Sequence, residues 1–285
     1  MITAVRSSGR RSAGRRRRRG RRGAGTLAAM PGSPFLPTGR SDVVGRIDEL
    51  GMFPAPGIRE RRVFVWRPPG YDAGTAHPVV YMHDGQNLVD PRTASFGADW
   101  QVDEVAAGLI AAGRIPPILV VGAECTAERR EEYGEGSAGR AYLRFLVEGL
   151  KPLIDARYPT LPGRESTMVM GSSMGGLISF LALYHCGETF GGAGCLSPAF
   201  SPGLCAGVAD AAWPDRPFRL YLDNGGVGLD AELQPGLEGM LAVLEAKGFR
   251  RGKGLDVVVD PAAEHFEDAW AARVWRPLEF LFAAG

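Results

Sequence analysis

The sequence predicts an α/β fold with a mostly parallel central sheet and helices on both faces. Short apolar or β-branched runs alternate with longer amphipathic stretches, which is the pattern of strands joined by crossover helices. Several runs are apolar without alternation, as expected of strands covered on both sides. A chain of 285 residues with 45% hydrophobic content can bury a core of this size.

The expected elements follow one another in a regular order. The first clear strand, 62–66, ends at a Pro-Pro-Gly sequence, and we expect it in an antiparallel start of the sheet. Further strands are expected at 78–83, 118–122, 167–171, 192–196, 219–222 and 255–259. Helices are expected at 101–112, 141–156, 176–186, 235–247 and 267–283.

The first 41 residues differ sharply in composition from the rest. Residues 1–41 hold eleven arginines and no acidic side chain, whereas acidic side chains outnumber basic ones in residues 42–285. Such a basic segment cannot bury enough apolar surface to offset the entropy of ordering it. We therefore predict a disordered Arg-rich tail over 1–41 and a single domain over 42–285. The simplest interpretation of the tail is an extension with no structural role, with Met30 as the true start.

Composition also limits location and partners. Clustered arginines can bind phosphates, but no aromatic or groove-reading element accompanies them, so we do not expect nucleic-acid binding. Residues 23–30 are too short and glycine-rich for the apolar part of an export signal, and no run of 18 apolar residues predicts a transmembrane segment. We therefore expect a cytoplasmic protein. The four cysteines have no metal-ligand spacing with the histidines and are expected to be free thiols without a metal: Cys125, Cys186, Cys195 and Cys205.

One short motif points to a chemistry. Residues Gly171 to Gly175 read Gly-Ser-Ser-Met-Gly and lie between an expected strand and an expected helix. This is the G-x-S-x-G pattern of a nucleophile elbow in its strand–turn–helix setting. A serine hydroxyl becomes reactive when a tight turn holds it where a histidine can take its proton. Because the five letters alone occur easily by chance, the setting carries the prediction that Ser173 is a nucleophile.

A candidate base lies downstream of Ser173. His265 comes just after the expected strand 255–259, on a loop at the carboxyl edge of the sheet, where catalytic groups of such folds are found. His185 lies inside the helix that follows the elbow, so we expect it to point away from the site.

The carboxylate that orients the histidine has two candidates. Asp223 follows the strand 219–222, and Asp230 lies beyond a glycine-rich loop. Either can accept the imidazole N–H and fix its tautomer. We prefer Asp230, because the loop can carry it to His265, whereas we expect Asp223 to bond loop amides.

A developing oxyanion needs two backbone N–H donors. Met174, directly after Ser173 at the positive end of its helix, is one candidate. The other is expected in the loop after the strand 78–83, where we prefer Gln86 and keep Gly85 as the near alternative.

With these residues in place, the chain resembles the putative-esterase family of α/β-hydrolases, which contains esterase D, feruloyl esterases and enterochelin esterases. The resemblance covers about residues 55–283 and implies an α/β-hydrolase fold with Ser173, Asp230 and His265 as the triad. One departure is that four residues, Gly225 to Gly228, precede Asp230, where relatives carry the acid closer to the strand end. The resemblance rests on 81–88, 99–103, 129–133, 145–158, the elbow, 220–223 and 264–270.

The resemblance also suggests residues for the pocket mouth. Trp100, Arg129, Glu132 and Tyr133 are expected to flank it, as an aromatic platform and an Arg–Glu pair for a polar part of the substrate. Equally, Trp100 can be a core residue, and Arg129 with Glu132 a solvated pair on a helix face.

Three functions follow from these residues. The leading one is a serine carboxylic-ester hydrolase that acts on a small-molecule ester through an acyl-enzyme and requires no cofactor. The alternatives are an acyltransferase of the same fold and a non-catalytic binder on a hydrolase scaffold. The sequence does not specify the ester or the oligomeric state.

Overall fold

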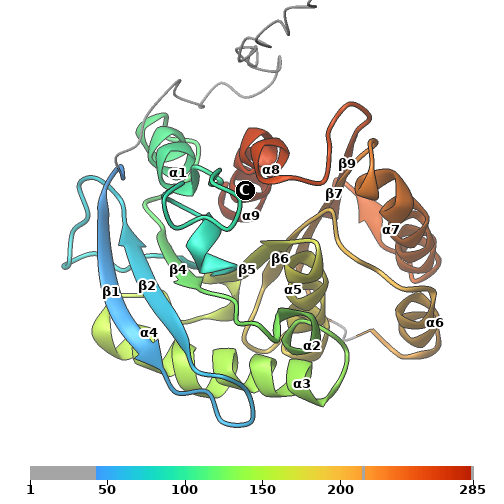
Figure 1. The fold of residues 1–285 in the computed structure, drawn as a ribbon, viewed down its shortest axis with the longest axis horizontal. Helices are drawn as coiled ribbons and strands as arrows, with labels where there is room; N and C mark the ends of the chain where they lie inside the picture. The colour runs from blue at the N-terminus through green and yellow to red at the C-terminus, as the bar shows by residue number, and fades with distance from the viewer. Residues whose placement is uncertain (1–42, 214–215, 284–285) are drawn as a thin grey trace, which may run out of the picture.

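The computed structural model describes residues 43–213 and 216–283 (Figure 1). The Arg-rich tail predicted for 1–41 lies outside the described residues. Within them, the chain forms one sheet with helices on both faces, which confirms the predicted fold class. No helix in the described ranges combines the length and the apolar character that crossing a membrane requires.

The described sheet has nine strands in the order β1-β2-β4-β3-β5-β6-β7-β9-β8. Only β2 runs against the others, because it pairs antiparallel with both β1 and β4. The predicted antiparallel start is therefore confirmed, and the carboxyl ends of the remaining strands meet at one edge. The strands are β1 (Arg46–Phe53), β2 (Arg61–Arg67), β3 (Val79–His83), β4 (Leu119–Ala123), β5 (Thr167–Ser172), β6 (Gly192–Leu196), β7 (Arg219–Gly225), β8 (Arg250–Arg251) and β9 (Gly254–Asp260).

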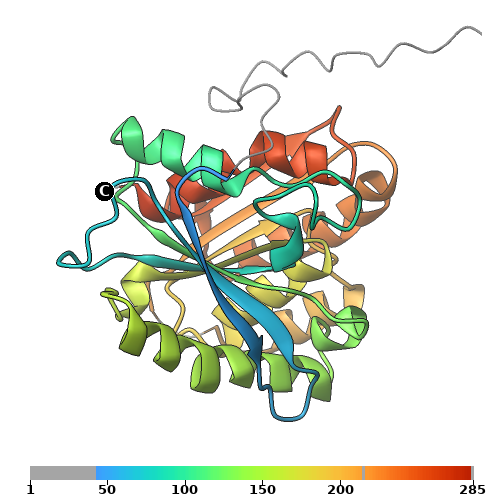
Figure 2. The same cartoon turned by 60° about the vertical axis from the view of Figure 1, so that its left-hand side comes forward.

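The helices form two layers, one on each side of the sheet (Figure 2). The first layer consists of α1 (Val102–Ala111), α8 (Glu267–Arg273) and α9 (Trp275–Phe282). The second layer contains α2 (Arg129–Glu132), α3 (Ser137–Arg144), the π-helical turn Phe145–Leu150, α4 (Lys151–Arg157), α5 (Met174–His185), α6 (Pro202–Asp210) and α7 (Leu229–Ala246).

Each helical layer covers its own hydrophobic core. Successive strand residues point to opposite faces, so Val80 packs toward α1 and α9 while its neighbour Tyr81 packs toward the second layer. Both side chains are fully buried. The unalternating apolar strands are explained by this arrangement, since each of their faces needs apolar side chains.

Several helices differ from the prediction. The expected helix 141–156 begins earlier and consists of α3, the π-helical turn and α4. The expected helix 267–283 is two helices, α8 and α9, and α7 begins at Leu229 instead of at Pro235. Pro235 lies inside α7, where it removes one intrahelical hydrogen bond. The turn before Pro235 is held from outside the helix, because the Asn224 side chain donates to the Asp230 carbonyl at 2.8 Å. Asp230 is therefore in the first turn of a helix and not in a loop.

Candidate active site

The turn between β5 and α5 consists of Ser173 alone. Its backbone has φ 57° and ψ −121°, a conformation that costs a non-glycine residue about 1–3 kcal/mol. Three backbone hydrogen bonds hold it: Ser173 N donates to the Leu196 carbonyl at 2.9 Å, and the Ser173 carbonyl accepts from Leu177 and Ala199. A Cβ on Gly171 would lie 2.8 Å from the Gly175 carbonyl carbon, so the turn closes only with glycine there.

Ser173 and His265 line the same cavity, of about 330 Å³, at the carboxyl edge of the sheet. Their side chains are not hydrogen-bonded to each other in this structure. Such bonds are often long before substrate binds and tighten in the complex. A larger cavity of about 660 Å³ lies between α3, α5 and α6, and His185 lines that one instead, away from Ser173 as predicted.

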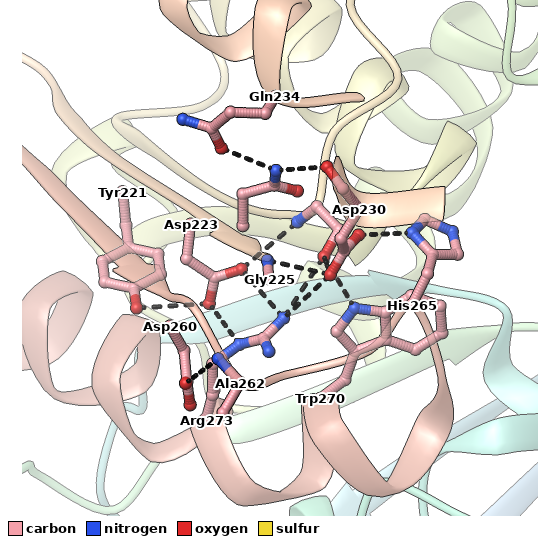
Figure 3. A network of polar contacts seen from close by, with 12 residues as sticks. Tyr221, Asp223, Gly225, Asp230, Gln234, Asp260, Ala262, His265, Trp270 and Arg273 are labelled. Carbon is pink, nitrogen blue, oxygen red and sulfur yellow. Dashed lines mark hydrogen bonds and ion pairs between the residues drawn. The ribbon is translucent and has the colours of Figure 1, made fainter. Parts of the chain in front are cut away.

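His265 is paired with Asp230 (Figure 3). The imidazole Nδ1 lies 2.6 Å from Asp230 Oδ1, and Asp230 is fully buried. In the tautomer that carries its proton on Nδ1, the imidazole donates to the carboxylate and keeps Nε2 free to accept a proton. The His265 and Trp270 rings pack edge to face with their centroids 4.9 Å apart.

The second oxygen of Asp230 has its own partners. Asp230 Oδ2 accepts from the Gly225 backbone N–H at 2.8 Å and from the Ser197 hydroxyl at 3.0 Å. The positive end of α7 also favours a carboxylate at this position. Gly228, before α7, has φ 60° and lets the chain turn into the helix.

Asp223 has a different environment from the one we expected. The strand β7 continues to Gly225, so Asp223 lies inside the strand and is fully buried. Its carboxylate pairs with Arg273 of α8, with Nε at 3.2 Å, and accepts from Ser197 N, which follows β6, instead of from amides of the glycine-rich loop after β7. Burial raises the pKa of Asp223, and the Arg273 guanidinium opposes this shift.

The two expected oxyanion donors lie at helix starts. Met174 is the first residue of α5, and Gln86 is the second residue of a short 3-10 helix, Gly85–Asn87, after β3. Backbone N–H groups in the first turn of a helix have no acceptor within it. Gln86 lines the cavity, and its side-chain Oε1 accepts from Cys125 N at 3.1 Å. This bond fixes the loop against the end of β4.

Of the expected mouth residues, Arg129 lines the cavity. Its guanidinium binds both oxygens of Asp84 at 2.7 Å, and Asp84 immediately precedes the 3-10 helix. Glu132 pairs with the buried Arg61 at 3.0 Å. The Arg129–Glu132 pair considered from the sequence, at the mouth or on a solvated helix face, therefore does not form.

Trp100 and Tyr133 are buried and do not line the cavity. Trp100 packs against Trp270 with ring centroids 5.6 Å apart, as in the core alternative. Tyr133 packs against His83 with the two rings tilted, and its hydroxyl accepts a hydrogen bond from Asp84 N at 3.3 Å. Burial lowers the pKa of His83 to about 3, so this histidine stays neutral behind the site.

We expect the substitution Trp100→Ala to lower the free energy of unfolding by about 3–5 kcal/mol, because it leaves a cavity in the hydrophobic core between the sheet and the layer of α1, α8 and α9. Trp100→Phe fills more of that space and should leave KM unchanged, since the side chain does not reach the site cavity. Urea denaturation and steady-state kinetics check both variants. A large rise in KM with unaltered stability would instead indicate a substrate contact.

Several cavity residues were missed from the sequence, among them Cys125, Phe96 and Phe266. Cys125 lies two residues beyond the end of β4, and its position near the carboxyl end of a strand was a signal that could have found it. Burial raises the pKa of its thiol to about 11. Phe96 and Phe266 are exposed, with ring centroids 5.6 Å apart, on the cavity wall. Phe266 adjoins His265, but Phe96 lies in a polar loop without any pattern.

Comparison with known protein families adds an independent finding. The family model Esterase, described as "Putative esterase", matches residues 58–272. The chain belongs to this esterase family. This is the family that the sequence motifs indicated.

Individual relatives of this esterase are distant. YbbA of Bacillus subtilis (strain 168), described as uncharacterized, is 26% identical over 145 residues, which are 49% of this chain and 57% of that protein. The chain thus matches little more than half of the length of this curated relative.

Solved structures share the fold of this esterase. The enterochelin esterase from Shigella flexneri has a TM-score of 0.68 at 18% identity, with 82% of this chain and 57% of that chain covered. A ferulic acid esterase from Anaeromyces mucronatus, solved with ferulic acid, has a TM-score of 0.66 at 17% identity. The match covers 86% of this chain and 93% of that chain. At these identities the likeness establishes the α/β-hydrolase fold.

Proposed function

We propose that the protein is a serine carboxylic-ester hydrolase in which Ser173 is the nucleophile, His265 the general base and Asp230 the residue that orients the histidine. The observation that carries the proposal is the 2.6 Å Asp230–His265 pair on the same cavity as a serine in a tight, strained turn. Family membership supports ester hydrolysis as the reaction.

The reaction proceeds through an acyl-enzyme. Ser173 Oγ attacks the ester carbonyl while its proton passes to His265 Nε2, and Asp230 stabilises the resulting imidazolium. The negative oxygen of the tetrahedral intermediate binds the N–H groups of Gln86 and Met174. Collapse breaks the ester bond, and the alcohol leaves with the proton from His265.

Water then completes the cycle. It attacks the acyl carbonyl as His265 takes one of its protons, and the second tetrahedral intermediate releases the acid and returns the proton to Ser173 Oγ. Every step uses groups of this chain and water, so the reaction requires no metal or organic cofactor.

The cavity suits a small-molecule ester. Its volume of about 330 Å³ is at the lower end of small-ligand sites, and Phe96 and Phe266 supply an apolar wall. The four free cysteines of the described residues are in keeping with a reducing, cytoplasmic location.

Product analysis with an activity-based probe tests the proposal. Purified protein is given aryl esters of graded acyl length, with and without an alcohol acceptor, and is separately treated with a fluorophosphonate. We expect free acid to form without acceptor and the probe to label the peptide that contains Ser173. Transfer of the acyl group with free acid at background would make the protein an acyltransferase. Absence of both turnover and labelling would make it a binder.

A further inference from the structure

Ser197 is a buried residue that the proposed reaction does not use directly. It follows β6, has no exposed surface, and has φ 43°, in the left-handed region. Its backbone N–H points at Asp223, with the carbonyl oxygen at 2.9 Å and Oδ1 at 3.2 Å. The residue thus lies between β6 and β7, beneath the Asp230–His265 pair.

The partners of the Ser197 hydroxyl fix the direction of its proton. Trp270 Nε1 lies 3.1 Å and Arg273 Nη2 lies 3.2 Å from Ser197 Oγ, and both groups are donors that cannot accept. A serine hydroxyl has one proton and two acceptor lone pairs, so these two donors occupy both lone pairs. The remaining contact, to Asp230 Oδ2 at 3.0 Å, must receive the proton.

This fixed donor restricts the Asp230 carboxylate. With the Gly225 N–H, the Ser197 hydroxyl holds Oδ2 from two directions, which leaves Oδ1 aimed at His265 Nδ1. Arg273 lies 4.0 Å from Oδ2, too far for a hydrogen bond, and reaches the carboxylate through the Ser197 oxygen. Rotation of the carboxylate would break both bonds to Oδ2 and leave two buried donors without an acceptor.

We propose that Ser197 is a positioning residue for catalysis, whose hydroxyl locks the Asp230 carboxylate in the orientation that pairs with His265. The inference rests on the proposed function, because it assigns Ser197 a role through the Asp230–His265 pair. The backbone conformation of Ser197 also supports the inference. Glycine adopts φ 43° more easily than serine does, so the turn alone does not require this side chain.

Two substitutions separate the hydroxyl from the turn. Ser197→Ala and Ser197→Gly both remove the hydroxyl, but only glycine also relieves the positive φ. If the hydroxyl positions Asp230, both variants lose about 10- to 100-fold in kcat with little change in KM. If Ser197 only shapes the turn, Ser197→Gly matches the wild type, and the inference is wrong.

A spectroscopic reading tests the same point without turnover. The His265 Nδ1 proton in its short bond to Asp230 should give a far-downfield proton NMR resonance, and this signal should shift or broaden in both variants. An unchanged resonance in a folded variant would overturn the inference. If Ser197→Ala does not fold, Ser197→Gly has the less strained backbone and provides both measurements, kcat and the NMR resonance.

Ser201→Ala is the matched control. The Ser201 hydroxyl accepts from Leu204 N at 3.0 Å at the start of α6 and does not line the site cavity, so its loss should lower the melting temperature without changing kcat or the resonance. Ser173→Ala is measured alongside. If Ser173→Ala stays active, the proposed function fails. If it is inactive while both Ser197 variants keep wild-type kcat, only the role of Ser197 fails.

Discussion

Replacing Ser173 with alanine is expected to lower kcat/KM by about 10⁴- to 10⁶-fold. The substitution removes the atom that forms the acyl-enzyme, and what remains is the weaker catalysis by the oxyanion donors and by binding. The fold should be unaffected, because alanine and serine are equally strained at φ 57° and the three backbone bonds of the turn stay. Steady-state kinetics with an aryl ester and a thermal melt give the two measurements.

Ser179→Ala is the control for this result. Ser179 lies in α5, the helix that follows Ser173; its hydroxyl donates to the Gly175 carbonyl at 2.7 Å and does not line the cavity. Its loss should leave turnover near the wild-type rate. Fluorophosphonate labelling should disappear in Ser173→Ala and persist in Ser179→Ala. Labelling that survives unchanged in Ser173→Ala would show that another serine is the nucleophile.

The second large effect is expected for Asp230→Asn, with a loss of about 10³- to 10⁴-fold in kcat. Asp230 Oδ2 faces two donors, the Gly225 N–H and the Ser197 hydroxyl, so the amide oxygen of asparagine must take that side. Its NH₂ group then faces His265 Nδ1 and forces the tautomer that carries the proton on Nε2. An imidazole in this form cannot take the proton of Ser173, and the charge that stabilises the imidazolium is also gone.

Asp223→Asn is the matched comparison for Asp230→Asn. It removes the carboxylate that pairs with the buried Arg273 and should cost about 3–5 kcal/mol of unfolding free energy, while kcat per folded molecule changes little. Urea denaturation and active-site titration separate the two quantities. If Asp223→Asn abolishes turnover in folded protein and Asp230→Asn is mild, the two aspartates have exchanged roles.

Local patterns were sufficient for much of the fold. The parallel strands were predicted because each is a short apolar run covered by helices on both faces, as Val80 and Tyr81 illustrate. Ser173 and His265 could be named because each lies in the segment that follows a strand: Ser173 comes directly after β5, and His265 lies five residues beyond the end of β9. Their position at one edge follows from the strand order.

The rest depended on contacts between distant segments. The sequence left Asp223 and Asp230 open because the decision depends on where β7 ends, and the strand is three residues longer than its apolar run. Ser197 and Arg273 carry no motif, and their contact joins residues 76 positions apart. Trp100 was expected either at the mouth or in the core, and the choice depends on Trp270, which packs against it from α8.

The segment between β3 and α1 contributes Phe96 to the cavity wall, and hydrogen bonds hold this segment to the residues at its own beginning. Thr93 Oγ1 donates to the Gln86 carbonyl at 2.8 Å, and Ser95 N donates to the Asn87 side chain at 2.8 Å. We therefore expect substitutions at its tip, as at Phe96, that keep Thr93 and Ser95 to leave the proposed catalytic residues in place. For the proposed reaction, we therefore expect the choice of ester and the cleavage of its bond to depend on different residues and to respond separately to engineering.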